Sequence, residues 1–302
     1  MRAVGEPERR FEEDALRILR LYRFAARFGF AIDPATGAAA RALGPHLDCV
    51  SAERIQEELL KLLAAPRPGS YLEPAVLAVV LPELEPEKQP ERFAELCRTI
   101  DRIEPTAENV PARLAALLCP LGEAGARKAL RKLKCSNALT DEVTALEREA
   151  GGGAGSFLLG HESGHSIARP IACGNRVPPQ RTVLGETPGT PNTTLTVQAK
   201  RLLSRYELPT IQRLTVLCSA RHPEQAEAFA ALRAEAEQLT AENACCRVSQ
   251  LAVNGRDLMA AGVRPGPGLR QVLNALLEAV ITGQTPNEKD ALLAAAAQFS
   301  AS

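Results

Sequence analysis

The sequence of 302 residues has no tryptophan, and only 4% of its residues are aromatic. Aromatic and β-branched residues favour strands, whereas Ala, Leu, Glu and Arg favour helices. These four helix formers dominate the sequence. The composition therefore predicts an all-α fold.

Net charge and long apolar runs are also missing. Thirty-six basic residues balance 36 acidic ones, so a polyanion such as RNA would have to be met by local basic patches. The apolar run AVLAVVL stops at Pro82, far short of the roughly 20 residues that span a bilayer. The first residues, MRAVGEPERRF, lack the apolar core of a secretory signal. We therefore expect a cytoplasmic protein without a membrane partner.

The eight cysteines include no CxxC pair and follow no regular spacing. Such spacing is not typical of a structural metal site or of a disulfide framework. Reduced thiols and no bound metal are the simplest expectation.

The stretch FEEDALRILRLYRFAARFGF, residues 11 to 30, is heavily charged on one side. At about 100° per residue, one helix would carry a stripe of four arginines, with Glu13 and Asp14 in its first turn. The arginines are Arg17, Arg20, Arg23 and Arg27.

Two interpretations fit this stripe. It can be a solvated face in which Asp14 and Arg17 pair and the acids complement the helix dipole. Alternatively, the carboxylate acceptor and the guanidinium donors together can match the mixed donor and acceptor edge of a nucleobase.

Residues 2 to 33 closely resemble the start of the neck domain of bacterial-type CCA-adding tRNA nucleotidyltransferases and the related poly(A) polymerases. The family's EDxxRxxR motif is present as Glu13, Asp14, Arg17 and Arg20. The resemblance implies that Asp14 and Arg17 act as a template for incoming CTP or ATP. It also implies that Arg20 lies toward the triphosphate.

A second segment, LDCVSAERIQEELLKLLAAPRP at residues 47 to 68, resembles the next neck motif, ERIxxEL. The motif is matched by Glu53, Arg54, Ile55, Glu58 and Leu59. Ser51 is a good N-cap, Pro66 ends the helix, and Arg54 and Glu58 are spaced to pair. Glu53, Arg54 and Glu58 are expected to support the template helix rather than to touch nucleotide.

Residues 126 to 137, ARKALRKLKCSN, resemble a stretch of the family's body domain. On a helix Arg127, Arg131 and Lys134 would share one face, which could contact the tRNA backbone. An ordinary solvated helix has the same pattern. Residues 253 to 293 are also similar to the family, with a Gly266-Pro267-Gly268 turn before an apolar helix.

Residues 151 to 195 are rich in Gly, Pro and Thr and match nothing in the family. They form a flexible insertion, a lineage-specific loop or a stretch whose reading frame departs from its neighbours, and their composition predicts mobility. The insertion contains HESGH, in which His161, Glu162 and His165 spell the HExxH of zinc proteases. Neighbouring glycines and Pro170 oppose the helix that zinc binding needs. A zinc hydrolase is therefore only a distant alternative.

The sequence contains no DxD and no GGxxRD-like stretch, although nucleotidyl transfer in this family uses such residues in a catalytic head that binds metal ions. The resemblance thus implies a neck at residues 1–66, a helical body at 67–150 and a tRNA-binding body and tail at 196–302, with the unmatched segment at 151–195 between them. Residue 1 falls close to where the head should already have ended, so the head is expected to be missing.

The leading hypothesis is the C-terminal part of a tRNA nucleotidyltransferase, which selects CTP and ATP and holds tRNA. A separate catalytic head would be its partner, and Mg²⁺ would bind only with that head. A non-catalytic helical RNA-binding or scaffold protein is the alternative.

Overall fold

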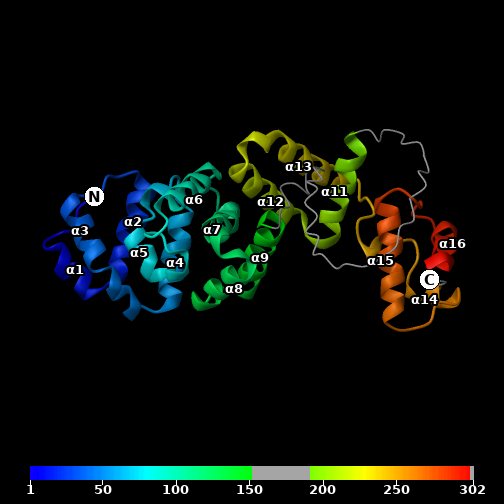
Figure 1. The fold of residues 1–302 in the computed structure, drawn as a ribbon, viewed down its shortest axis with the longest axis horizontal. Coiled ribbons are helices and arrows are strands. Elements are labelled where there is room, and N and C mark those ends of the chain that lie inside the picture. The colour runs from blue at the N-terminus through cyan, green and yellow to red at the C-terminus, as the bar shows by residue number, and fades with distance from the viewer. Residues whose placement is uncertain (152–190, 300–302) are drawn as a thin grey trace, which may run out of the picture. The chain divides into compact units, whose positions relative to one another are not determined.

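A computed structural model describes residues 1–151 and 191–299 of the chain (Figure 1). Within these ranges the chain forms α-helices and short 3₁₀ helices and no strand, which confirms the all-α prediction. The α-helices of the first range are α1 (Pro7–Glu13), α2 (Leu16–Phe28), α3 (Pro34–Ala42), α4 (Ala52–Leu63), α5 (Pro74–Val80), α6 (Pro90–Arg102), α7 (Val110–Leu118), α8 (Gly122–Lys132) and α9 (Asn137–Gly151). Those of the second are α11 (Pro191–Arg205), α12 (Leu208–Arg221), α13 (Ala226–Ala241), α14 (Gly255–Ala260), α15 (Pro267–Ile281) and α16 (Lys289–Phe299).

Short 3₁₀ helices connect many of these elements. They are η1 (Gly44–Cys49), η2 (Gly69–Tyr71), η3 (Pro82–Leu84), η4 (Ala107–Asn109), η5 (Cys119–Leu121), η6 (Pro223–Gln225) and η7 (Val248–Gln250).

The described chain divides into two compact units. The first comprises residues 1–151 and 207–233, and the second comprises 191–206 and 234–299. The boundary at residue 66 stays a prediction, since helices on both of its sides belong to the first unit. The expected insertion at 151–195 and its HESGH sequence lie, apart from residue 151 and the start of α11, outside the described residues.

Helix α7 is the centre of the first unit, where it packs against α4, α6, α9 and α12. Its Arg113 is fully buried and donates hydrogen bonds to the carbonyls of Leu63 and Ala65, each at 2.6 Å, and to that of Ile103. These carbonyls lie at the C-terminal ends of α4 and α6, where no further helical turn can bond them. One guanidinium therefore ties together the ends of two helices.

Close packing of η2 against α6 requires a glycine at position 69. A Cβ on Gly69 would lie 2.3 Å from the Cys97 carbonyl oxygen, and the Gly69 amide donates to Asp101 at 2.8 Å. Only glycine fits this approach of η2 to α6.

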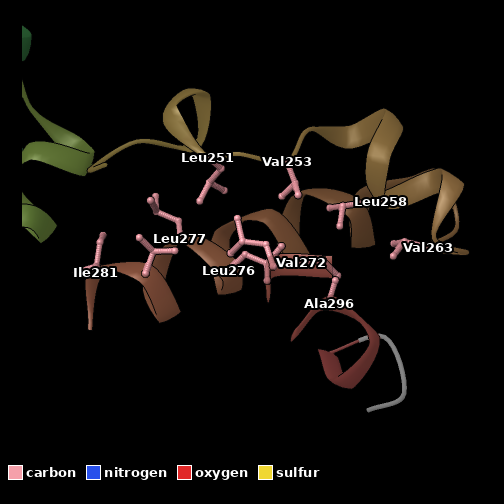
Figure 2. Packing of buried hydrophobic residues seen from close by; sticks show 11 residues of the cluster. Leu251, Val253, Leu258, Val263, Val272, Leu276, Leu277, Ile281 and Ala296 are labelled. Atoms are coloured by element: carbon pink, nitrogen blue, oxygen red, sulfur yellow. The ribbon is translucent and has the colours of Figure 1, made fainter. Parts of the chain in front are cut away.

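The second unit has an apolar core of its own, formed by α14, α15, α16 and the segment before α14 (Figure 2). Leu258 and Leu276 are fully buried within it, and Leu292 joins them from α16. The predicted turn at Gly266 is confirmed: its φ of 141° suits glycine, and Pro267 begins α15.

Candidate functional site

The charged stretch at residues 11 to 30 is two helices, not the single helix that the pattern predicts. The chain breaks at Asp14, whose backbone is extended with φ −154° and ψ 99°. The Asp14 Oδ1 atom accepts a hydrogen bond from the Leu16 amide at 3.2 Å. A short carboxylate that bonds the backbone in this way competes with helix formation. Asp14 therefore stands at the junction of α1 and α2 and not in the first turn of a helix.

Arg17 forms its ion pair with Glu13, so the expected pair of Asp14 with Arg17 is wrong. The Arg17 Nη1 atom lies 2.8 Å from Glu13 Oε2 and 3.1 Å from the Arg10 carbonyl oxygen. The hydrogen bond from Arg17 is the main reason that the pKa of Glu13 lies below its usual value, and the hydrogen bond from Arg10 adds to this effect. Both contacts of Arg17 use Nη1, which leaves Nε and Nη2 of the guanidinium without a partner in the described chain.

Asp14 instead faces Arg54 of α4, with 3.5 Å between Asp14 Oδ2 and Arg54 Nη2. The expected pair of Arg54 with Glu58 is also wrong, because these two side chains have different partners. Arg54 therefore supports the junction residue directly. Glu53 is exposed in the first turn of α4 and forms no ion pair with any residue that the structure describes.

Glu58 is buried between α2 and α4 and contacts two arginines. Its carboxylate oxygens lie 2.7 Å from Arg23 Nε and 3.5 Å from Arg20 Nε. The guanidinium of Arg23 also stacks 3.9 Å from the centre of the Phe24 ring. Arg23 is thus a packed residue and not a member of a solvated stripe.

A cavity of about 380 Å³ opens beside these charges and is lined by Arg10, Arg17 and Arg20 together with Phe11 and Phe24. It combines guanidinium groups with apolar and aromatic surface. Cations can hold phosphate while the apolar walls cover a flat ring. The structure thus brings Arg17 and Arg20 to one cavity, with Glu13 bonded to Arg17 and Asp14 at the adjoining helix junction.

The predicted basic ridge on residues 126 to 137 is only partly present. Arg127 is engaged by Asp141 at 3.0 Å and by the Thr144 hydroxyl at 2.9 Å, so it joins α8 to α9. Lys134 lies beyond the end of α8 with a φ of 56°, so the three residues do not share one helical face.

The cations that remain accessible lie around the C-terminal end of α8. They are exposed and form no salt bridge with any residue in the described ranges: Lys128, Arg131, Lys132 and Lys134. Lys128 and Lys132 are additions that the sequence pattern did not single out.

No group of three His, Cys, Asp or Glu side chains gathers to hold a metal ion in residues 1–151 and 191–299. The described residues therefore offer no grouped carboxylates to the Mg²⁺ that the resemblance implies. None of the helices described is both long enough and apolar enough to cross a membrane.

The architecture and the cavity define a class: an all-α protein in which arginines of α1 and α2 line a cavity together with apolar and aromatic side chains. Two family profiles match parts of the chain. Residues 29–88 match the "Probable RNA and SrmB-binding site of polymerase A", and residues 198–296 match tRNA nucleotidyltransferase domain 2. The CCA-adding enzyme of Levilactobacillus brevis is 30% identical over 301 residues, which are 98% of this chain and 63% of that enzyme.

Solved structures agree. The Bacillus stearothermophilus CCA-adding enzyme in complex with CTP matches with a TM-score of 0.67 and 26% identity, over 97% of this chain and 64% of that one. The Thermotoga maritima enzyme complexed with tRNA shares the fold, with a TM-score of 0.54 and 17% identity over 95% and 62%. The chain is therefore similar to CCA-adding tRNA nucleotidyltransferases over nearly its whole length. It spans somewhat less than two thirds of the length of these relatives.

Proposed function

We propose that this chain is the nucleotide-selecting and tRNA-holding part of an enzyme that adds C and A residues to tRNA 3′ ends in the cytoplasm. The observation that carries the proposal is the match to CCA-adding enzymes over 98% of the chain. Arg17 and Arg20 line one cavity, and Asp14 lies at the junction of the helices α1 and α2 that contribute to it; this arrangement supports the proposal.

Nucleotide selection is assigned to Asp14 and Arg17. The Nε and Nη2 atoms of Arg17 can donate to a base, while Glu13 holds the guanidinium through Nη1. Asp14 supplies acceptor atoms and is oriented by the Leu16 amide and by Arg54. A base that offers a matching amino group and ring acceptor satisfies both residues, and a base that leaves them unpaired is penalised.

Nucleotidyl transfer itself is assigned to a catalytic head, in the part of the relatives that this chain does not match. The 302 residues contain no DxD, and the described residues gather no metal-binding group. When bound in that head, Mg²⁺ would supply stabilisation of the transferring phosphoryl group. This chain's own residues would select the base and hold the tRNA.

A chimera tests the proposal. The matched portion of the Bacillus stearothermophilus enzyme is replaced by this chain, and addition of labelled CMP and AMP is measured on tRNA that lacks its 3′ CCA. The chimera should label the tRNA, whereas the chain alone should not. Labelling by the chain alone would refute the assignment of transfer to a separate head.

Arg17→Ala in the chimera should lower the preference for CTP and ATP over GTP and UTP by roughly tenfold to a hundredfold, because one bidentate contact is lost. Arg98→Ala is the matched control, since Arg98 also forms an exposed ion pair one helical turn from a glutamate, Glu95. Unchanged selectivity in Arg17→Ala would contradict the assignment. A chimera that binds tRNA but transfers nothing would favour the non-catalytic RNA-binding alternative.

A further inference from the structure

A second cavity in the first unit has a different chemistry. It measures about 390 Å³ and lies between α2, α3, η2 and the start of α5. It shares no lining residue with the cavity of Arg17 and Arg20. Its volume falls within the range of small-molecule sites.

Tyr22 lines this cavity from α2, and its side chain is only 4% exposed. Its hydroxyl lies within reach of the Glu73 carboxylate, but it makes no hydrogen bond of ordinary geometry with any described residue. Burial, first, and then the charge and proximity of Glu73 raise the pKa of Tyr22 above its usual value, so the hydroxyl keeps its proton. A buried hydroxyl whose acceptor is poorly aligned has hydrogen-bonding capacity left for a ligand.

Arg41 and Glu73 lie side by side at the same cavity. The Arg41 Nη1 and Glu73 Oε2 atoms are 3.5 Å apart, which is longer than a good hydrogen bond. Half of the Arg41 side chain is exposed and 22% of the Glu73 side chain. The pair therefore presents guanidinium donors next to carboxylate acceptors that are not saturated by each other.

The lining carries one more acidic than basic side chain, which disfavours strongly anionic ligands. Hydrogen bonds from Thr36 hold the pKa of Asp33 below its usual value, so Asp33 is ionised near neutral pH. Asp33 and Glu73 together outweigh Arg41. A phosphate group would be repelled, whereas an uncharged ring with both donors and acceptors would not. Tyr71 adds a second phenol ring to the lining.

We infer that this cavity binds an amino-bearing nucleobase, as an uncharged nucleoside or as an unpaired base of RNA. The Glu73 carboxylate accepts from the exocyclic amino group, Arg41 donates to the neighbouring ring or carbonyl acceptor, and the Tyr22 hydroxyl donates to a further acceptor. Uracil has no amino group for Glu73 and binds more weakly. The site is independent of the proposed nucleotide selection at Asp14 and Arg17.

Calorimetric titration of the full chain with cytidine, adenosine, guanosine and uridine tests the inference, and a short single-stranded RNA of A and C residues serves as the second probe. At least one amino-bearing nucleoside, or the RNA, should saturate the chain. Uridine should bind at least about tenfold more weakly than the amino-bearing nucleoside that binds best. Saturation by nucleosides identifies a free-ligand site, and saturation by RNA alone identifies a base within a strand.

Three variants locate the binding. Glu73→Gln should weaken it about tenfold or more and Tyr22→Phe about fivefold, while Glu57→Gln, on the exposed side of α4, should not change it. The titrations are repeated in an Arg17→Ala background, in which base reading at the proposed nucleotide site is lost, and the binding that persists there belongs to this cavity. Tyr22→Phe removes only a hydroxyl that makes no hydrogen bond of ordinary geometry, so the variant should fold. No saturable binding, equal binding of uridine, or binding unaffected by Glu73→Gln and Tyr22→Phe would overturn the inference.

Discussion

Arg23 of α2 and Glu58 of α4 form a largely buried ion pair, with 2.7 Å between Arg23 Nε and Glu58 Oε2. Their side chains are only 14% and 5% exposed. Without Arg23, the buried Glu58 would keep only the more exposed Arg20 at 3.5 Å, so much of its charge would be uncompensated. Arg23 therefore holds the two helices that carry the candidate site, although its place in the sequence suggests a surface charge.

Arg23→Ala should lower the free energy of unfolding by about 3 kcal/mol, because the charge of Glu58 loses its close partner. Urea denaturation measures this loss. Arg98→Ala removes an exposed pair and should cost less than about 1 kcal/mol. Equal losses in the two variants would show that Arg23 belongs to a solvated stripe after all.

The contrast between Arg23 and Arg17 shows what the sequence could predict. Helical periodicity predicted the amphipathic segments, the N-cap position of Ser51 and the turn at Gly266, because these depend on neighbouring residues. The EDxxRxxR motif predicted that Arg17 and Arg20 act at the same site, and in the structure both line one cavity.

The partners of these charges could not be predicted, because they are chosen by packing between helices. Asp14 breaks the helix locally and then meets Arg54, which is 40 residues away. The spacing along α4 predicted a pair of Glu58 with Arg54, yet Glu58 sits beside Ile55 and Leu59 on the buried side of α4 and its partners come from α2. Its position next to that apolar stripe was the one signal that its partner lies on another helix.

Arg113→Met should destabilise the first unit by about 3 to 5 kcal/mol. The substitution keeps much of the side-chain volume but leaves the carbonyls of Leu63, Ala65 and Ile103 without their donor in the interior. Lys61→Met, at a half-exposed position of α4, is the control and should change stability by less than about 1 kcal/mol. Chemical denaturation of both variants measures the free energy of unfolding. A small loss of stability in Arg113→Met would mean that other groups replace the hydrogen bonds of Arg113.

Glu147 of α9 should make stability depend on pH in an unusual direction. It is 3% exposed, and burial raises its pKa to about 7, with Arg221 opposing the shift only in part. Because the folded-state pKa exceeds the unfolded one, this contribution to stability is complete below about pH 4.5 and is lost as the pH rises through 7.

Glu147→Gln should remove that dependence. Between pH 5 and 8 the parent should lose about 2 kcal/mol more stability than the variant. Urea titrations at several pH values measure the difference in the free energy of unfolding between the parent and the variant. The contributions of the other titrating groups cancel in this difference. A difference that stays constant with pH would show that Glu147 is ionised throughout or is bonded by a group that replaces its proton.

The cations at the end of α8 give the last prediction, which concerns tRNA. Arg131 and Lys132 are exposed and unpaired in the described chain, so their counter-charge must come from solvent or from a polyanion. If they contact phosphates, the double variant Arg131→Ala and Lys132→Ala should weaken tRNA binding. It should also reduce the slope of log affinity against log salt concentration by roughly one to two, since each phosphate contact contributes nearly one.

Arg127→Ala separates this interpretation from that of a uniform basic ridge. Arg127 is bonded to Asp141 and Thr144, so its loss should loosen the contact of α8 with α9 and lower stability while leaving the salt slope nearly unchanged. Filter binding of labelled tRNA over a series of salt concentrations provides the slope for all three proteins. A smaller slope for Arg127→Ala than for the double variant would move the RNA contact from the end of α8 to its middle, and an unchanged slope in both would remove α8 from the RNA-binding surface.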